Sequence, residues 1–120
     1  MPMRNYTIAD IAHGRSGDKG NHANIALIAY TPAGYAWMKE NLTAEKIHAY
    51  FSPLHPSSVE RYEVDNLWAL NFFLRNVLAG GASRSLRIDT QGKSLALTLL
   101  RMPVTLPEDP GPLLRSGLSS

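Results

Sequence analysis

The sequence predicts an α+β fold in a single domain, and three observations support this. Residues 59–64 and 83–89 alternate between polar and apolar side chains, as half-exposed strands do. Residues 25–30 are apolar on both alternating faces, which is typical of a buried strand. Thr31-Pro32 offers an N-cap followed by proline at the first helical position, which predicts a helix to about Asn41.

Length and composition agree with one folded domain. The chain has 120 residues, of which 44% are hydrophobic and 18% are charged, so it can build a core and is not a disordered polyelectrolyte. It has no cysteine, which excludes disulfide scaffolds, thiolate metal sites and a cysteine nucleophile.

Several partner classes are not expected. No apolar run is long enough to span a membrane, and the first residues lack the apolar core of a signal peptide, so we expect a cytoplasmic protein without a membrane partner. The formal charge is only +2, and Tyr62 is the only aromatic residue in the two charged strands. A nucleic-acid partner is therefore not expected.

The first half of the chain is expected to hold two strands. The first covers residues 6–13 and stops at Gly14. The second is the apolar run 25–30, which we place in the centre of the sheet because both of its faces need cover.

A second helix and an edge strand follow the helix that begins at Pro32. Thr43 begins the helical piece 43–51, in which Leu42 and Ile47 are spaced as a hydrophobic staple. The half-exposed pattern of 59–64 then predicts a strand at the edge of the sheet.

The longest helix is predicted at residues 67–78, after a capping residue and before a glycine pair. Its apolar side chains spread around most of the circumference and leave a narrow polar stripe of Asn71 and Arg75. Such a helix must be covered on two sides, and we expect another subunit to supply part of that cover.

The last third is harder to assign. A strand is predicted at 83–89, and the pattern of 93–102 fits either a strand or a helix, of which we favour the helix. We expect residues 1–104 to form the domain and the proline-rich segment 105–120 to be an extended or disordered tail.

Residues 13–24, His-Gly-Arg-Ser-Gly-Asp-Lys-Gly-Asn-His-Ala-Asn, are the densest group of reactive and permissive residues. Glycine at every third position permits positive φ and lets backbone amides converge as a nest, while Arg15 and Lys19 supply charge for a phosphate or carboxylate. The segment therefore predicts an anion site. With Arg84 from a later turn, its expected ligand-binding residues are Gly14, Arg15, Gly17, Gly20, Asn21, Asn24 and Arg84.

The same segment has a purely structural interpretation. A long polar hairpin would use the glycines in turns and pair Asp18 with Lys19. We favour the anion site because glycine loses more chain entropy on folding than any other residue, and core burial does not account for three of them. The segment is neither a Walker A loop nor a dinucleotide fingerprint, so nucleoside triphosphate binding is not expected.

The residue types of this segment also permit catalysis. Candidates for acid–base or nucleophilic roles are His13, Ser16, Asp18 and Lys19. No Gly-x-Ser-x-Gly elbow surrounds Ser16. The spacing of His13 and His22 matches no helical metal-ligand pair, so we expect no metal, and the sequence implies no cofactor.

Blocks of residues in a fixed order extend this motif along most of the chain: 13–25, 50–51, 61–63, 66–72 and 83–93. Together they resemble the small C-terminal domain of the AtuA family, the acyclic terpene utilisation proteins, over about residues 6–104. The resemblance implies a two-layer ferredoxin-like α/β sandwich, with a mixed or antiparallel four-stranded sheet and helices on one face. In the family this domain is normally fused behind a much larger one and linked to bacterial breakdown of citronellol, geraniol and related compounds through acyl-CoA intermediates.

Two functions follow from the residues and the resemblance together. The first is an accessory subunit in acyclic terpene or branched acyl-CoA catabolism, whose glycine-rich loop binds the anionic part of a CoA ester or carboxylate. The alternative is a non-enzymatic assembly module that oligomerises or docks on a larger AtuA-like partner. A chain of 120 residues with this pattern is expected to be a split-off subunit, in a homo-oligomer or a hetero-complex.

Overall fold

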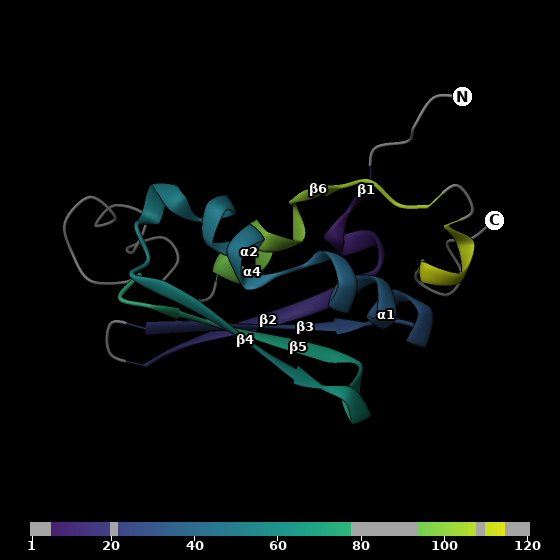
Figure 1. Cartoon of the computed structure of the whole chain (residues 1–120), viewed down its shortest axis with the longest axis horizontal. Helices are drawn as coiled ribbons and strands as arrows, with labels where there is room; N and C mark the ends of the chain where they lie inside the picture. Colours follow the sequence, from purple (N-terminus) through teal and green to yellow (C-terminus); the bar gives the residue numbers. More distant parts are fainter. Residues whose placement is uncertain (1–5, 20–21, 78–93, 108–109, 115–120) are drawn as a thin grey trace.

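The computed structural model describes residues 6–19, 22–77, 94–107 and 110–114. The described elements form two layers, an antiparallel four-stranded sheet and a group of helices on one of its faces (Figure 1). This confirms the predicted α+β sandwich. In spatial order the strands are β2 (Ala12–Lys19), β3 (His22–Ala29), β5 (Ala69–Arg75) and β4 (Ser58–Val64).

The sheet is assembled from two hairpins, β2–β3 and β4–β5, joined side by side through β3 and β5. Because β3 and β4 are each antiparallel to β5, they run parallel to each other with β5 inserted between them. This is the split β-α-β arrangement of ferredoxin-like domains. β3 is central and β4 lies at an edge, as the sequence predicts.

The first two helices have the predicted threonine caps, and their bounds lie within about one residue of the predicted ones. α1 (Pro32–Asn41) and α2 (Ala44–Tyr50) begin after Thr31 and Thr43. Each threonine hydroxyl accepts a hydrogen bond from the backbone amide three residues on, which satisfies one of the amides left unpaired at a helix start.

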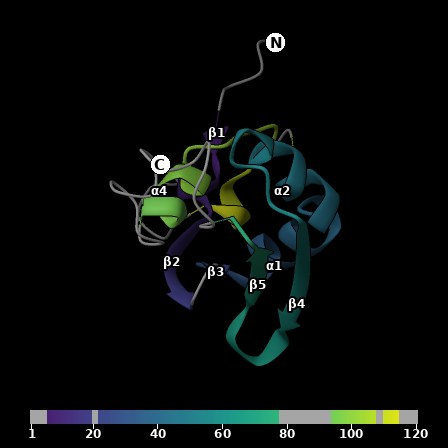
Figure 2. The ribbon, with the colours of Figure 1, turned by 90° about the vertical axis from the view of Figure 1, so that its left-hand side faces the viewer.

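A third helix, α4 (Ser94–Leu100), confirms the helical interpretation of 93–102. It packs on β2 and β3, while α1 packs on β3 and β5, and α2 packs on β4. Figure 2 shows these helices together on one side of the sheet. The core between the layers includes the fully buried side chains Ile25, Leu27, Met38, Leu42, Ile47, Leu70, Phe72, Leu74, Leu95 and Leu99.

The two ends of the described chain pack beside the helices. β1 (Tyr6–Thr7) pairs with β6 (Pro103–Val104). Within the segment predicted as a tail, the short η5 (Gly111–Leu113) packs against α1, and Leu113 joins the core. No helix in the described ranges is long and apolar enough to cross a membrane.

The predicted helix at 67–78 is wrong. Residues 65–67 form the short 3₁₀ turn η3 (Asp65–Leu67), and the apolar run that follows is β5. Leu70, Phe72 and Leu74 are fully buried against the helices, whereas Asn71 and Phe73 lie on the opposite face and are half-buried. Because these residues form a turn and a strand, their apolar pattern does not indicate a helix that another subunit must cover.

The single strand predicted at 6–13 is also wrong. After β1 the chain turns through η1 (Ile8–Asp10) before β2 begins. Thr7 and Asp10 form a capping box at this turn, and the Thr7 amide donates to Asp10 Oδ2 at 2.9 Å. The strand predicted at 83–89 lies outside the described residues.

Candidate functional site

The β2–β3 hairpin divides the glycine-rich motif between two faces of the sheet. In β3 burial alternates, and Ala23, Ile25, Leu27 and Ala29 are buried under the helices. Antiparallel partners point to the same side. Gly14 and Ser16, opposite Leu27 and Ile25, therefore lie on this helix-covered face, and His13, Arg15 and Gly17, opposite Ile28, Ala26 and Asn24, lie on the other, which we call the open face.

Gly14 is explained by packing. A Cβ at Gly14 would lie 3.1 Å from the Ala26 carbonyl oxygen, 3.2 Å from Leu27 Cδ2 and 3.8 Å from Ala96 Cβ of α4. A glycine in a strand often marks such a close approach. Its absent side chain lets α4 pack directly on β2.

The predicted amide nest is wrong for Gly14 and Gly17. Both are strand residues paired with β3, and neither has the positive φ that a nest needs. The hairpin interpretation is correct in outline, although these two glycines lie within the strand and not in its turn. Gly20, Asn21 and Arg84 lie outside the described residues.

Part of the predicted anion set does share the open face. Arg15 is exposed, Gly17 follows two residues later, and Asn24 lies opposite Gly17, with its Oδ1 3.4 Å from where a Gly17 Cβ would be. Asn24 Nδ2 donates to Asn71 Oδ1 at 3.1 Å. No ion pair involves Arg15 among the side chains that the structure describes.

The candidate catalytic residues are not brought together as a Ser–His pair. His13 is exposed on the open face and stacks on Tyr30, with ring centroids 5.4 Å apart, whereas Ser16 lies on the helix-covered face. Asp18 and Lys19 end β2 opposite Ala23 and His22. Among the described residues, no three or more His, Asp or Glu side chains are placed to hold a metal ion.

The rest of the open face combines apolar side chains with one ion pair. No described helix covers this face. Arg75 Nε donates to Glu60 Oε2 at 2.8 Å, and its guanidinium lies 4.9 Å from the Phe73 ring centroid. The hydrogen bond from Arg75 is the main cause that lowers the pKa of Glu60, and the hydrogen bond from Tyr62 lowers it further. The apolar positions in the outward register are Ala26, Ile28, Tyr62, Val64, Ala69 and Phe73, of which Ala69 is buried.

The turn between β4 and β5 carries two exposed apolar side chains. Leu67 is 59% exposed and Trp68 is 40% exposed. Trp68 has φ 54° and ψ 41°, the left-handed conformation, which costs a residue with a Cβ about 1 kcal/mol or more. Its amide donates to the Asp65 carbonyl at 3.2 Å and its carbonyl accepts from the Ala29 amide at 2.9 Å, so the strained backbone is held on both sides.

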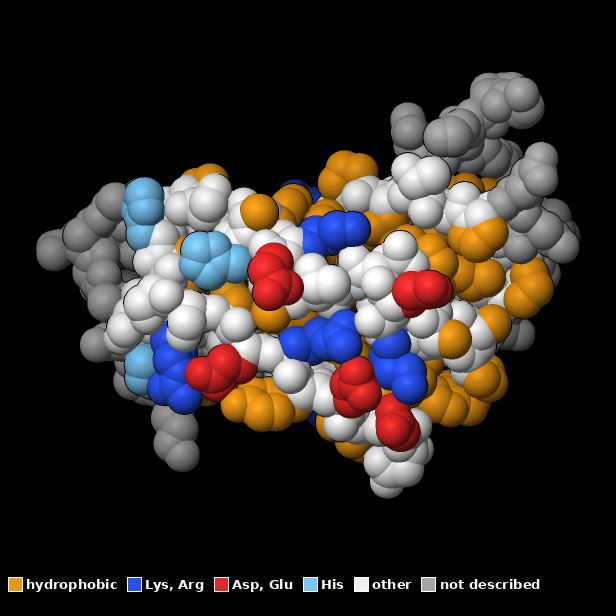
Figure 3. Space-filling view, in the orientation of Figure 1, with side chains coloured by type: hydrophobic (Ala, Val, Ile, Leu, Met, Phe, Trp, Pro, Cys, Tyr) orange, Lys and Arg blue, Asp and Glu red, His pale blue; other side chains and the backbone are white. Residues whose placement is uncertain are grey.

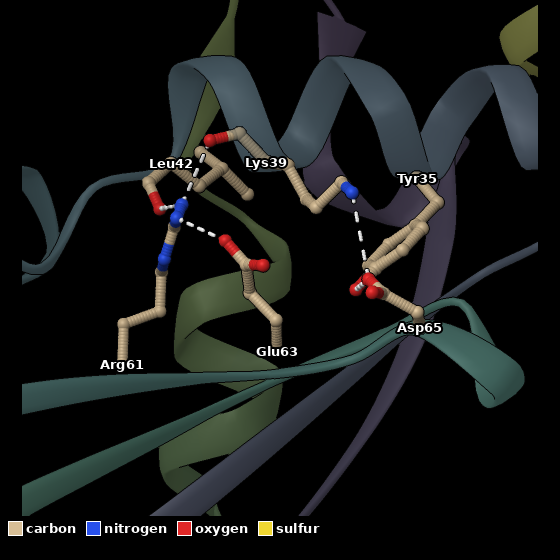
Figure 4. A network of polar contacts seen from close by, with 6 residues as sticks. All are labelled: Tyr35, Lys39, Leu42, Arg61, Glu63 and Asp65. Atoms are coloured by element: carbon tan, nitrogen blue, oxygen red, sulfur yellow. Dashed lines mark hydrogen bonds and ion pairs between the residues drawn. The ribbon is translucent and has the colours of Figure 1, made fainter.

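A polar link ties this turn to α1 (Figure 4). The buried Tyr35 donates its hydroxyl to Asp65 Oδ1 at 2.6 Å, and Lys39 Nζ lies 3.4 Å from the same oxygen. Burial, and then the hydrogen bond to Asp65, raise the pKa of Tyr35 to about 12. The Tyr35 hydrogen bond, and then the charge of Lys39, lower the pKa of Asp65.

A second link joins β4 to the end of α1. Arg61 Nη1 donates to the carbonyls of Lys39 and Leu42 at 2.8 and 3.0 Å, and Nη2 donates to Glu63 at 2.8 Å. Lys39 lies in the last turn of α1 and Leu42 is its C-cap, where no further amide of the helix is available to these carbonyls. The guanidinium thus caps α1 and fixes β4 beneath it.

Comparison with known proteins decides the family. The family model described as the AtuA ferredoxin-like domain matches residues 6–105 of the 120. The chain belongs to this family. No curated protein and no solved structure gives a match.

In this AtuA ferredoxin-like domain, the matched range contains the four described strands of the sheet, the turn between β4 and β5 and the described helices α1, α2 and α4. It ends just after β6, so η5 lies beyond it. The open face and the turn are therefore parts of the family domain itself.

Sequence reasoning missed Leu67, Trp68, Tyr35 and Asp65. The first two were assigned to a helix, and the link between the other two joins segments 30 residues apart. One local signal was present, because Asp65-Asn66 lies between two short strand-like runs, as in a hairpin turn.

Proposed function

We propose that this domain is an assembly module that docks its open face on a larger AtuA-like protein. The observation that carries the proposal is the uneven cover of the sheet. The helices α1, α2 and α4 lie on one face, while the other presents Tyr62, which is 53% exposed, beside the half-buried Phe73. Apolar side chains grouped on a surface and flanked by polar ones are typical of protein interfaces.

Charge supports a protein with its own acidic groups as the partner. Glu60 is the carboxylate in the outward register of β4, and Arg75 pairs with it. Arg15 at the opposite side of the face is exposed and pairs with none of the described carboxylates. Among the described side chains of this face, Arg15 therefore has a positive charge left for a partner to neutralise.

Membership of the family supports a larger AtuA-like protein as the partner in this proposal. A domain that is normally fused to a larger one has a natural surface for that larger one, and a separate chain would use the same surface between subunits. In this proposal the complex serves the breakdown of acyclic terpenes or branched acyl-CoA compounds, as the resemblance implies.

The proposal is tested by mixing the purified chain with a purified AtuA-like protein that carries the larger domain, followed by sedimentation velocity and calorimetry. We expect a complex that Ala26→Arg weakens at least about tenfold, because Ala26 lies in the middle of the open face. Ala49→Arg, on the exposed surface of α2, is the matched control and should bind normally.

Circular dichroism shows whether each variant is folded, and Tyr62→Ala gives a milder change on the same face. Absence of any complex with the wild-type chain would contradict the proposal. A wild-type homodimer that Ala26→Arg separates would also contradict it, since a second copy would then occupy the open face.

A second candidate function is binding of the anionic part of a CoA ester or carboxylate, and Arg15 favours it. Arg15 is exposed beside Gly17 and Asn24 on one face. Thermal shift with CoA thioesters, simple carboxylates and phosphate tests this. Stabilisation of the wild type that Arg15→Ala abolishes and Arg101→Ala retains would support it, and no stabilisation by any of them would contradict it.

A further inference from the structure

We infer that Leu67 and Trp68 form a preformed apolar anchor that inserts into an apolar pocket with a basic rim on the larger AtuA-like protein. This inference rests on the proposed docking function and names the residues that supply most of the affinity. Tryptophan is among the residues that most often dominate the binding energy of protein interfaces.

Trp68 is one of four large apolar side chains that are exposed among the described residues, and it is 40% exposed. The other tryptophan, Trp37 of α1, is partly buried against the core. The left-handed backbone at Trp68 is one that glycine or asparagine adopts more readily. A bulky residue kept in a strained and exposed position points to a role in binding.

The anchor is held rigidly by groups that reach the core. Backbone hydrogen bonds close the turn from Asp65 to Trp68 and join Trp68 to Ala29 of β3. Tyr35, only 5% exposed, holds the Asp65 side chain from the helix layer. A side chain fixed before binding loses less entropy in the complex, so rigidity here increases affinity.

The charged side chains near the turn indicate which charges the partner's pocket should carry. In the Lys39–Asp65 pair the carboxylate side chain is 69% exposed and the lysine 37%. In the Arg61–Glu63 pair the values are 44% for the glutamate and 20% for the arginine. In each pair the carboxylate is the more exposed member, so Asp65 and Glu63 form an acidic rim beside the turn. A partner surface that carries lysine or arginine complements this acidic rim.

The same rim disfavours two other occupants. Two copies meeting turn to turn would bring carboxylates together, and an anionic lipid surface would repel them. Figure 3 shows acidic side chains beside basic ones over the β4 side of the molecule, in agreement with these pairs. The turn projects beyond the rest of the sheet in Figures 1 and 2, where a pocket could receive it.

Affinity measurements with the same AtuA-like protein test the anchor. We expect Trp68→Ala to weaken binding at least about tenfold and Leu67→Ala to weaken it less. Leu97 of α4 is 60% exposed, almost the same as Leu67, so Leu97→Ala is the matched control and should leave the affinity unchanged. Trp68→Gly, which suits the left-handed backbone, checks that the loss does not come from unfolding of the turn.

Fluorescence gives a second readout of insertion. In a Trp37→Phe background Trp68 is the only tryptophan, and its emission should shift to shorter wavelength when the partner binds. In a Trp68→Phe background the emission of Trp37 should not shift.

The two proposals fail in different ways. If the wild-type chain forms no complex, the docking function itself is wrong. If the complex forms and Ala26→Arg weakens it, while Trp68→Ala and Leu67→Ala bind as tightly as the wild type, only the anchor is wrong. Insertion into vesicles of anionic lipid, seen as the same emission shift without the partner, would also overturn the anchor.

Discussion

Phe72 and Phe73 are neighbours in β5 and lie on opposite faces of the sheet. Phe72 is fully buried beneath the helices, while Phe73 is half-buried and contacts His22 and Arg75 on the open face. The helix-covered face thus supplies the hydrophobic core that the described fold needs. Apolar side chains on the open face add little to that core, which leaves them available for a partner.

The largest effect expected from this comparison is on stability. Phe72→Ala should lower the free energy of unfolding by about 3–5 kcal/mol, because it removes a buried ring and leaves a cavity. Phe73→Ala should cost less than about 1.5 kcal/mol, since its ring has only partial contacts to lose. Urea denaturation of the two variants measures the difference, and equal losses would show that the open face is part of the core.

The two described glycines of β2 give a smaller test of the same contrast. Gly14→Ala should destabilise the domain by about 1 kcal/mol or more, because its Cβ would press on the Ala26 carbonyl and Leu27. Gly17→Ala, on the open face, meets only Asn24 Oδ1 at 3.4 Å and should be neutral or stabilising by up to about 1 kcal/mol. Thermal unfolding of the two variants, measured in parallel, compares their stabilities. A larger loss of stability for Gly17→Ala than for Gly14→Ala would contradict the assignment of these glycines to the two faces.

The elements that the sequence predicted well are those with local signals. α1 and α2 have threonine caps whose side chains bond the first turn, and a cap is visible in a few consecutive residues. The central strand β3 contains the continuous apolar run 25–29, which already indicated a place inside the sheet, although the described helices cover only one of its faces. In such cases neighbours in sequence are enough to specify the structure.

β5 was predicted wrongly because its decisive partner is remote in sequence. Leu70, Phe72 and Leu74 alternate as a strand, but the surrounding apolar residues also fill a helix of the same length. Pairing with β3, more than 40 residues earlier, decides between the two. When a strand completes a sheet, such pairing outweighs the local preference of its residues for helix or strand.

In the candidate site, too, residue chemistry was visible in the sequence, whereas the positions of the residues depend on strand pairing. Arg15, Gly17 and Asn24 were selected for their chemistry and do share a face, but the reason is strand register and not a loop of converging amides. Gly14 was selected for flexibility and serves close packing. The Trp68 anchor depends on a turn whose existence follows only once β4 and β5 are known to pair.

The smallest expected effect concerns the link between the helix layer and the turn that carries the anchor. Tyr35→Phe removes the donor to Asp65, and we expect a modest loss of thermal stability that depends on pH. The pKa of Asp65 is lowered in the folded state, so this contribution is present above the ordinary carboxyl value of about 4 and is lost as the pH falls through the folded value.

At high pH the direction of the change in stability follows from the titration of Tyr35. Its pKa is raised from 10.0 to about 12, so the contribution of the neutral phenol is present below the ordinary value and is lost as the pH rises through the folded one. The difference in Tm between the wild type and Tyr35→Phe should therefore be largest between about pH 5 and 9 and should narrow on both sides.

Tyr50→Phe is the matched control, because the Tyr50 hydroxyl donates to the Thr98 carbonyl and burial raises its pKa. The difference in Tm between Tyr50→Phe and the wild type should narrow at high pH only, since a carbonyl does not titrate. If the Tyr35 variant behaved in the same way, without narrowing in acid, the Asp65 carboxylate would not be the group that Tyr35 holds. The turn would then lack its link to the core, and the rigidity that favours anchoring through Trp68 would have to come from the backbone hydrogen bonds alone.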